Sequence, residues 1–358
     1  MSQQEVGARL AKLWRLEGPD VLRWQRMVDG CGVEHRCACA QPEDVITRTT
    51  AERMRMYEHF APDLAVEAAR SALDRAGVSA QNVTDVLLVS CTGFSAPGIE
   101  VDVIQRLALR DSVRRCTIGF MGCFGAITGL RQACALTAAD PRACVLLICV
   151  ELCSLHFRAD CALDNQVACA LFADGAAATI LCGDDFHAHE PLNHLVRNGS
   201  VHNVARRSSA LARVDLGCSK LLLEGKDWMS WQVSDQGFVM NLSREVPIAL
   251  RNAIADFVRN AQSNGMKFST QSRDPLRTFI VHPGGSAILD AVNAGLDLKN
   301  KAGIDCAREI LRERGNMSSC TVLHVLERAL MKGEKLPALM IAFGPGLTLE
   351  SVNLHPDE

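Results

Sequence analysis

The stretch GFMGCFGAITGLRQA, residues Gly119–Ala133, joins a strand to a helix and decides how the rest of the chain is interpreted. VRRCTIG, ending at its first glycine, is typical of a short buried strand, and Phe124–Ala139 has apolar residues at helical spacing. The glycines beside Cys123 permit a sharp turn that places its thiol before the unpaired amides of the helix. The helix dipole supplies up to ~2 kcal/mol toward a thiolate, so full activation would need a histidine partner. Alone, one cysteine among 16 is more simply a packing residue.

The composition is that of an ordinary globular protein with room for two core-sized units or one large one. Of 358 residues, 48% are apolar and 22% are charged. The net charge of −3 gives no footprint of nucleic-acid binding, and one Tyr with four Trp argues against a platform for stacking bases. We find neither the apolar segment of a signal peptide nor an apolar run of about 18 residues, and therefore expect a cytoplasmic protein without a membrane span.

The cysteines do not form a recognisable metal pattern. Without an export signal, most of the 16 are expected to be reduced thiols. The densest group, CGVEHRCAC, contains Cys31, His35, Cys37 and Cys39. Its spacing fits no common zinc pattern, and no second pair completes four ligands nearby. We therefore expect no metal site.

Helices and apolar strands alternate through the first half of the chain. Glu43–Ala76 is predicted to be helical, interrupted at Pro62 and stopped by Gly77. Continuous apolar strands are predicted at 86–90 and 143–154, with a helix between them behind Pro97. A helix or loop, the turn Asp174–Gly175 and a strand at 176–181 follow. This alternation predicts an α/β fold with a sheet covered on both sides.

The second half repeats this organisation after a polar, turn-rich segment at Gly183–Pro191. We predict helices in VPIALRNAIADFVRNA, GGSAILDAVNAGL and TVLHVLERALMKG, a strand in LRTFIVHPGG and two closing strands in ALMIAFGPGLTLESVNL. The halves end alike, with DGAAATILCG in one and GPGLTLESVNL in the other. This indicates a duplicated architecture, with halves at 1–185 and 186–358.

Two further polar residues occupy turns comparable to that of Cys123. His282 ends the strand TFIVHPGG, and Asn316 follows a glycine in RGNMSSCTVLHVL. Such turns cluster at the carboxyl edge of a doubly wound sheet, where ligands bind. A histidine in an apolar run is more often a core residue, however, and an asparagine after glycine is most often a helix cap. The residues alone leave the two interpretations evenly balanced.

The motifs around these residues resemble those of the type III polyketide synthases, the chalcone synthase-like family. They are MGCFGAITGLR, ALFADGAAATI, IVHPGGSAILDAV, RGNMSS and AFGPGLTLE, within a resemblance that runs from about Trp24 to Leu354. HPGG, which contains Gly284, and GPGLT, which contains Pro345, separate this family from the related ketoacyl-ACP synthase III enzymes. The resemblance implies a thiolase-like fold with five αβαβα layers in two similar halves, and a homodimer.

The resemblance also implies a reaction and its catalytic residues. It implies iterative condensation of malonyl-CoA onto an acyl-CoA starter, with no metal or other cofactor and no acyl carrier protein. Cys123 matches the acylated nucleophile of the family, and His282 and Asn316 match its histidine and asparagine. These types suit the chemistry, because a histidine ring and a neutral asparagine amide can donate to the enolate oxygen formed by decarboxylation.

Residues at other family positions are expected to line the substrate path. Phe172 matches a gatekeeper phenylalanine, and Met240 replaces the second one found in plant enzymes. Arg23 and Arg26 match two CoA-contacting basic residues, whereas the third basic position is Gly30. Glu151 falls where the family has a glutamate beside the catalytic centre.

The expected cavity wall departs from the plant pattern. Cys91 and Cys153 replace threonines, His156 replaces a third, and Trp231 falls near a small-residue position. SCTGF is shared with bacterial members, so the chain resembles a bacterial-type enzyme. From the softer wall we expect an aliphatic acyl-CoA starter and an alkylpyrone or alkylresorcinol product. A tetrahydroxynaphthalene-type or chalcone-type product is the alternative within this family.

Two alternatives concern the activity itself. A ketoacyl-ACP synthase III would carry out one condensation with an acyl carrier protein. Such a carrier is acidic and would bind a basic face of the enzyme, and the slightly acidic composition of this chain argues against one. A non-catalytic partner subunit would bind acyl-CoA or a sister chain, but such a protein usually loses its nucleophile. The starter, the number of extensions and the mode of cyclisation stay open.

Overall fold

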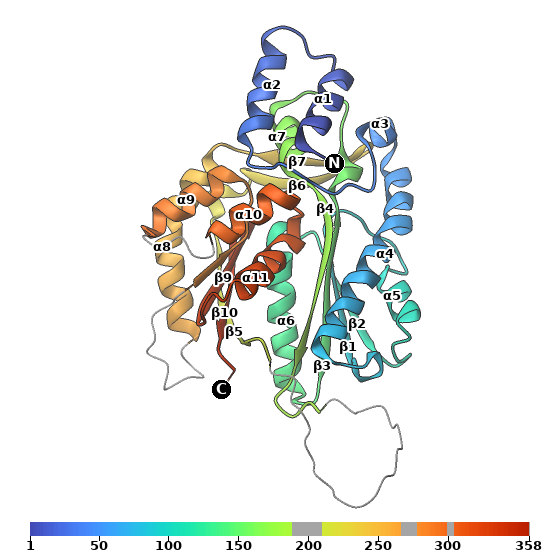
Figure 1. Cartoon of the computed structure of the whole chain (residues 1–358), viewed down its shortest axis with the longest axis vertical. Coiled ribbons are helices and arrows are strands. Elements are labelled where there is room, and N and C mark those ends of the chain that lie inside the picture. Colours follow the sequence, from blue (N-terminus) through green and yellow to red (C-terminus); the bar gives the residue numbers. More distant parts are fainter. Residues whose placement is uncertain (188–209, 266–277, 299–303, 358) are drawn as a thin grey trace, which may run out of the picture.

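Two four-stranded sheets, with helices between and outside them, make up the computed structural model of residues 1–187, 210–265, 278–298 and 304–357 (Figure 1). Helices α6 (Gly125–Ala139) and α11 (Thr321–Met331) form the central layer, because each contacts strands of both sheets. Helix α4 (Thr50–Ala76) covers the outer face of one sheet, and α8 (Glu245–Gly265) that of the other. The layers therefore alternate helix, sheet, helix, sheet, helix, which confirms the predicted fold class.

The first sheet has the strand order β2-β1-β3-β4. Its strands are β1 (Asp85–Ser90), β2 (Arg114–Gly119), β3 (Cys144–Leu152) and β4 (Asp174–Cys182). β1 and β3 are fully buried because their alternate side chains enter two different cores. Val86 and Leu88 pack into the core with α4, whereas Leu87 and Val89 pack into the core with α6. This two-sided burial explains their uninterrupted apolar sequences.

The second sheet has the order β5-β10-β9-β8. Its strands are β5 (Arg213–Leu221), β8 (Thr278–Val281), β9 (Ala338–Gly344) and β10 (Thr348–His355). β8 pairs with β9 in parallel and β9 pairs with β10 antiparallel, just as β1 pairs with β3 and β3 with β4. Along the chain, α6 comes between β1 and β3, and α11 comes between β8 and β9. The same unit is thus used twice around the central layer.

The remaining elements close one end of the molecule and the outer faces. Helix α7 (Leu163–Leu171), the first two N-terminal helices and the hairpin of β6 and β7 lie together at the top of Figure 1. These and the other outer elements are α1 (Gln3–Leu13), α2 (Pro19–Gly30), α3 (Pro42–Val45), α5 (Glu100–Arg106), β6 (Met229–Ser234), β7 (Gly237–Leu242), α9 (Ser286–Leu296) and α10 (Ile304–Arg314).

Several local predictions differ from the structure. α4 begins at Thr50 and runs through Pro62 without a break, because its alanines pack under β3 and β4 and this packing outweighs one missing hydrogen bond. Gly77 ends the helix in a left-handed conformation, as predicted. β2 was predicted to be buried but is an exposed edge strand, paired only with β1 among the described residues. Asp174–Gly175 is the start of β4 and not a turn.

Other predicted features are only partly described. The structure describes the predicted polar segment at Gly183–Pro191 only up to residue 187, and the rest of this segment lies outside the described ranges. The sequence interpretation did not predict α10, β5 or the β6–β7 hairpin. Within the part of the chain that the structure describes, no helix combines the length and apolar character needed to cross a bilayer.

Candidate active site

Cys123 lies at the apex of the turn between β2 and α6. The turn is a short 3₁₀ segment, Gly122–Phe124, and Cys123 itself is buried with 8% of its surface exposed. Gly122 has φ +70°, and a Cβ there would lie 2.4 Å from Cδ of Pro345, so only glycine fits. The N–H of Gly122 donates to Sγ of Cys91 at 2.9 Å, which ties the turn to the end of β1. The predicted strand, turn and helix around Cys123 are therefore present.

His282 follows β8 and is buried, with 1% of its surface exposed. Its backbone N–H donates to the carbonyl of Ile341 in β9, which fixes the residue at the end of the strand. Neither ring nitrogen has a hydrogen-bond partner among the described residues, although both are buried. A buried imidazole normally finds a partner, and an unpaired polar group costs about 1–3 kcal/mol. The ring is thus free to bind a group that enters the cavity.

Asn316 is equally buried, and its amide is held in one orientation. Oδ1 accepts a hydrogen bond from the backbone N–H of Ser318 at 2.9 Å, so Nδ2 must point the other way. Nδ2 lies 3.4 Å from the carbonyl oxygen of Gly284, two residues after His282. Because this contact is long, Nδ2 of Asn316 stays available as a donor, and it is directed toward the segment that carries the His282 imidazole.

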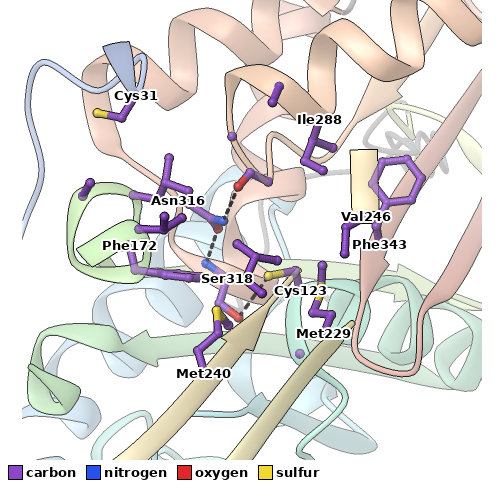
Figure 2. A pocket seen from close by; sticks show the side chains of 18 of the residues that line it. Cys31, Cys123, Phe172, Met229, Met240, Val246, Ile288, Asn316, Ser318 and Phe343 are labelled. Atoms are coloured by element: carbon purple, nitrogen blue, oxygen red, sulfur yellow. Dashed lines mark hydrogen bonds between the residues drawn. The ribbon is translucent and has the colours of Figure 1, made fainter. Parts of the chain in front are cut away.

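Ser318 joins these groups and was not identified from the sequence. Its hydroxyl Oγ lies 3.8 Å from Sγ of Cys123, and its N–H binds Asn316. Figure 2 shows Cys123, Ser318 and Asn316 in succession along one side of the pocket. The signal in the sequence was its position two residues after the candidate asparagine, at the start of a helix. Cys123, Ser318, His282 and Asn316 all line one cavity, so the structure brings the three predicted catalytic residues together.

The cavity does not favour an isolated charge on either reactive group. Burial raises the pKa of Cys123 to about 12, and hydrogen bonds from Ser318 and Asn316 oppose this rise. Burial lowers the pKa of His282 to about 3. Transfer of the thiol proton to the imidazole would instead create two opposite charges together, whose attraction offsets part of the burial cost. We therefore expect the ionisation of this pair to be coupled, with the helix alone unable to produce the thiolate.

Glu151 lies behind the turn that carries Cys91. Its carboxylate accepts hydrogen bonds from the Cys91 N–H at 2.9 Å, the Thr92 hydroxyl at 2.8 Å and the Ser319 hydroxyl at 2.5 Å. The side chain is completely buried, and this burial raises its pKa to about 7. It connects the end of β1 to the segment after Asn316 and does not line the cavity. Its place beside the catalytic centre agrees with the position given by the sequence.

The cavity has a volume of about 420 Å³ and is lined mostly by apolar and sulfur-containing side chains. Most of the other predicted substrate-path residues line it: Cys91, Cys153, Phe172, Trp231, Met240, Arg26, Gly284 and Pro345. Phe172 and Met240 lie on the same side of the pocket as Asn316 and Ser318, and Val246 and Phe343 lie opposite (Figure 2). His156 and Arg23 do not reach this cavity.

The cavity adjoins a smaller space of about 30 Å³, and four side chains line both: Cys153, Phe172, Trp231 and Met240. The indole N–H of Trp231 donates to the carbonyl of Cys91 at 2.8 Å, and its ring meets His156 and Phe238 edge-on. The ring nitrogens of His156 contact the Thr92 carbonyl and the Phe238 N–H. Burial lowers the pKa of His156 to about 3, so it is a neutral wall residue. His156 and Trp231 both line the smaller space.

Two arginines from separate elements reach the cavity. Arg26 comes from α2, and Arg244 directly precedes α8. Arg23 points elsewhere and pairs with Asp20 at 3.3 Å on the exposed surface. Arg244 was not identified from the sequence, because nothing local distinguishes it from a surface arginine. Together Arg26 and Arg244 place two positive charges beside an otherwise apolar cavity.

Comparisons with known proteins agree on one family. The family model described as chalcone and stilbene synthases, N-terminal domain, matches residues 39–185, and the C-terminal domain of the same family matches residues 214–356. The protein named "Putative chalcone synthase" from Bacillus subtilis (strain 168) is 33% identical over 274 residues, covering 75% of this chain and 70% of that protein. The 1,3,6,8-tetrahydroxynaphthalene synthase of Streptomyces peucetius subsp. caesius is 31% identical over 296 residues, covering 82% and 72%.

Solved structures share the whole architecture. The C-terminal type III polyketide synthase domain of Steely1, a type I/III hybrid from Dictyostelium, superposes with a TM-score of 0.85 at 25% identity. The superposition covers 99% of this chain and 95% of that domain. The two sheets and central helices described above are thus the thiolase-like arrangement of these synthases.

Proposed function

The chain belongs to the chalcone and stilbene synthase family, whose members are type III polyketide synthases of the acyltransferase class, and we propose that it extends an acyl-CoA starter with malonyl-CoA. The observation that supports this reaction best is the unpartnered, buried imidazole of His282 in the cavity that also holds Cys123 and Asn316. Thioester exchange needs a nucleophilic sulfur, and decarboxylation needs donors for a developing negative charge. The cavity contains both.

In the loading step, the thiol of Cys123 attacks the carbonyl carbon of the starter thioester. The imidazole of His282 takes the thiol proton as the bond to Sγ forms, then gives it to the departing CoA sulfur. The product is an acyl thioester on Cys123, and both protein groups are again neutral. The opposing pKa shifts of Cys123 and His282 fit this exchange, since neither group is charged before the substrate arrives.

In the extension step, malonyl-CoA loses CO₂ and forms an enolate on its thioester oxygen. The neutral His282 ring donates one N–H to this oxygen, and Nδ2 of Asn316 donates another. Removal of one such donor typically costs about 3 kcal/mol in the transition state. The enolate carbon then attacks the acyl carbonyl on Cys123, forms the carbon–carbon bond and expels the Cys123 sulfur. We propose that these protein groups suffice, without a metal or other cofactor.

The arginines at the cavity fit the phosphates of a CoA thioester. Arg26 and Arg244 approach from different elements and line the same space as the catalytic groups. Guanidinium groups bind phosphate oxygens with paired donors, and two of them from opposite elements can hold one diphosphate. The sequence suggested Arg23 and Arg26 on α2 for this role, with Gly30 at the third basic position; Arg23 pairs with Asp20 on the surface, and Arg244 takes its place at the cavity.

For the starter, we propose an aliphatic acyl-CoA, with an alkylpyrone or alkylresorcinol as product. The cavity wall consists mostly of aliphatic, aromatic and sulfur-containing side chains, and each buried methylene contributes about 0.8 kcal/mol. Met240 is flexible enough to pack along an alkyl chain. The fixed indole of Trp231 limits how far such a chain can extend.

A tetrahydroxynaphthalene-type product from malonyl-CoA alone is the second candidate. It is supported by the 31% identity to a 1,3,6,8-tetrahydroxynaphthalene synthase over most of both chains. A starter derived from malonyl-CoA is small and needs less of the space that Trp231 bounds. The two candidates therefore differ in whether a long acyl-CoA competes with malonyl-CoA for Cys123.

The experiment that tests the proposal measures CO₂ release from malonyl-CoA and identifies the products made from a panel of acyl-CoA starters by mass spectrometry. His282→Ala and Asn316→Ala should each lower decarboxylation about a hundredfold or more. Decarboxylation that survives both substitutions would show that another group holds the enolate. Absence of decarboxylation by the unmodified chain would instead indicate a non-catalytic acyl-CoA-binding subunit.

A further inference from the structure

Arg36 is a buried arginine whose hydrogen-bond partners are all uncharged. Its side chain is 3% exposed. Nη1 donates to the carbonyls of Cys169 and Phe172, each at 2.7 Å. Nη2 donates to the carbonyl of Ala170 at 2.7 Å and to Oε1 of Gln3. The guanidinium thus binds three carbonyls within four consecutive residues.

These carbonyls explain how a cation is held in this place without a carboxylate among its hydrogen-bond partners, while the Asp174 carboxylate adds an attraction at longer range. Cys169 and Ala170 belong to the last turn of α7, whose final carbonyls have no partner within the helix. The partial negative charge at a helix C-terminus attracts a cation. Burial lowers the pKa of Arg36, but a guanidinium keeps its proton in proteins. Its planar shape lets it serve several carbonyls at once.

The segment held by Arg36 supports two groups of the active site. Phe172, the last residue bound, lines the cavity. The residues on either side of it pair with Asn316: the Asn316 N–H donates to the Leu171 carbonyl at 2.9 Å, and the Ala173 N–H donates to the Asn316 carbonyl at 2.9 Å. The backbone of Asn316 is therefore fixed by the same short segment that Arg36 fixes from the other side.

We propose that Arg36 is a positioning residue for the decarboxylation step, an inference that rests on the proposed function. Arg36 touches no substrate. It holds the segment 169–173 in place, and this segment sets the position of the Asn316 amide and of the Phe172 ring. A displacement of about 1 Å in a catalytic group can cost a hundredfold in rate. Loss of the guanidinium should therefore impair the enolate-forming step more than the loading of Cys123.

The test compares two rates in the Arg36→Lys variant of the full chain. One is the turnover of malonyl-CoA decarboxylation, and the other is the acylation of Cys123 by a starter acyl-CoA, followed by mass spectrometry. Lysine keeps the charge but cannot bind three carbonyls at once. We expect decarboxylation turnover to fall tenfold or more with KM for malonyl-CoA changed less than threefold, while acylation changes less than threefold. An equal fall in both rates would overturn the proposal.

Arg53 provides the matched control. It is fully buried and also binds backbone carbonyls, those of Arg48, Leu155 and Phe157, but none near Asn316. Arg53→Lys should lower the thermal midpoint and leave the ratio of the two rates unchanged. A similar change of ratio in both variants would show that Arg36 acts only through general stability.

Gln3→Ala keeps the test decisive if Arg36→Lys does not fold. Gln3 accepts from Arg36 and donates to the Ala170 carbonyl at 2.9 Å, so its removal loosens the same segment. A smaller fall of the same ratio is expected, and an unchanged ratio would count against the role of Arg36. If the unmodified chain releases no CO₂ from malonyl-CoA, both inferences fail; if it does and the ratio is constant, only the role of Arg36 fails.

Discussion

Sγ of Cys123 and Oγ of Ser318 lie 3.8 Å apart, although 195 positions separate them in the chain. Each belongs to a short 3₁₀ turn that precedes a central helix: Gly122–Phe124 before α6 and Ser318–Cys320 before α11. The two turns contact each other between the sheets. These candidate catalytic groups therefore meet where the starts of the two equivalent helices meet, so the duplicated fold places them together.

We expect Cys123 to be the single site of acylation among the 16 cysteines. It alone combines the turn before α6 with contacts to Ser318 and the cavity of His282. Cys123→Ser should lose nearly all condensation, because a serine hydroxyl is far less ionised at neutral pH. Peptide mapping after brief exposure to a starter acyl-CoA checks the site, with Cys153→Ala as a control that still acylates at Cys123. An acyl group found mainly on Cys91 or Cys153 would reject the assignment.

His282→Gln should shift the pH at which Cys123 reacts with iodoacetamide to higher values. As the sulfur of the unmodified protein reacts, the imidazole of His282 can take up the thiol proton, and the imidazolium then stabilises the developing thiolate. Burial and the nearby Glu151 carboxylate already raise the pKa of Cys123 with His282 present, so removal of this proton acceptor should leave less reactive thiolate at neutral pH. We expect alkylation at pH 7 to slow tenfold or more.

The measurement is the alkylation rate of the Cys123 peptide between pH 5 and pH 10. His324→Gln is the control, because His324 lies outside the cavity and contacts the Ala176 carbonyl. Identical pH profiles for the unmodified protein and His282→Gln would contradict coupled ionisation of Cys123 and His282.

Glu151→Gln should change how stability depends on pH. Burial raises the pKa of Glu151 in the folded state to about 7, above its ordinary value of 4.5, so the folded chain holds this proton more tightly than the unfolded chain. The associated stability is fully present below pH 4.5 and is lost as the pH rises through 7. Between pH 4.5 and pH 8 the unmodified protein should lose roughly 3 kcal/mol relative to Glu151→Gln, since one pKa unit is about 1.4 kcal/mol. Urea unfolding at several pH values measures this, and parallel curves would refute it.

The protein should form a homodimer through the edge of the first sheet. β2 has an unpaired edge within the described residues, and Phe94, Phe120 and Met121 beside it are 51%, 40% and 36% exposed. Exposed edge strands and grouped apolar side chains are usually covered. Phe94→Glu should shift the protein toward monomer in light scattering at micromolar concentration. Met331→Glu changes another exposed apolar residue, with 75% of its surface exposed, and should leave the oligomeric state unchanged. A monomeric unmodified protein would count directly against the dimer.

Each of the three candidate catalytic residues sits beside a local signal in the sequence, a glycine turn at the end of a strand or before a helix, and the family resemblance singled them out. Ser318 follows the same glycine turn as Asn316, but its role appears only in its contact with Cys123. Arg36 and Arg244 carried no such signal, since their roles arise from contacts between segments far apart in the chain. The β6–β7 hairpin did carry a local signal, because the turn before Gly237 (φ +92°) separates the alternating sequence of β6 from the apolar sequence of β7. The burial of β2 was misjudged, because its sequence, RRCTIG, contains two arginines and a threonine, which fit the exposed edge strand that the structure shows.

Trp231→Gly should enlarge the range of starters. The indole is fixed by its hydrogen bond to the Cys91 carbonyl and by edge contacts with His156, and it stands between the main cavity and the small space behind it. Its removal should join the two spaces, leaving room for an alkyl chain whose methylenes each contribute about 0.8 kcal/mol. Four more buried methylenes would then contribute about 3 kcal/mol, which corresponds to roughly a hundredfold in affinity. We expect kcat/KM for the longer acyl-CoA to rise at least tenfold.

The deciding measurement is kcat/KM for long, medium and short acyl-CoA, with malonyl- and coumaroyl-CoA for comparison. In the unmodified protein a medium aliphatic starter should be preferred, and in Trp231→Gly the preference should move to longer chains. Val233→Gly is the matched control, because it changes an exposed residue of the same strand, β6. A preference of the unmodified protein for malonyl-CoA would favour the tetrahydroxynaphthalene-type reaction. An unchanged chain-length profile in Trp231→Gly would show that the wall does not limit the starter, because the alkyl chain must then leave the cavity by a path that avoids the indole.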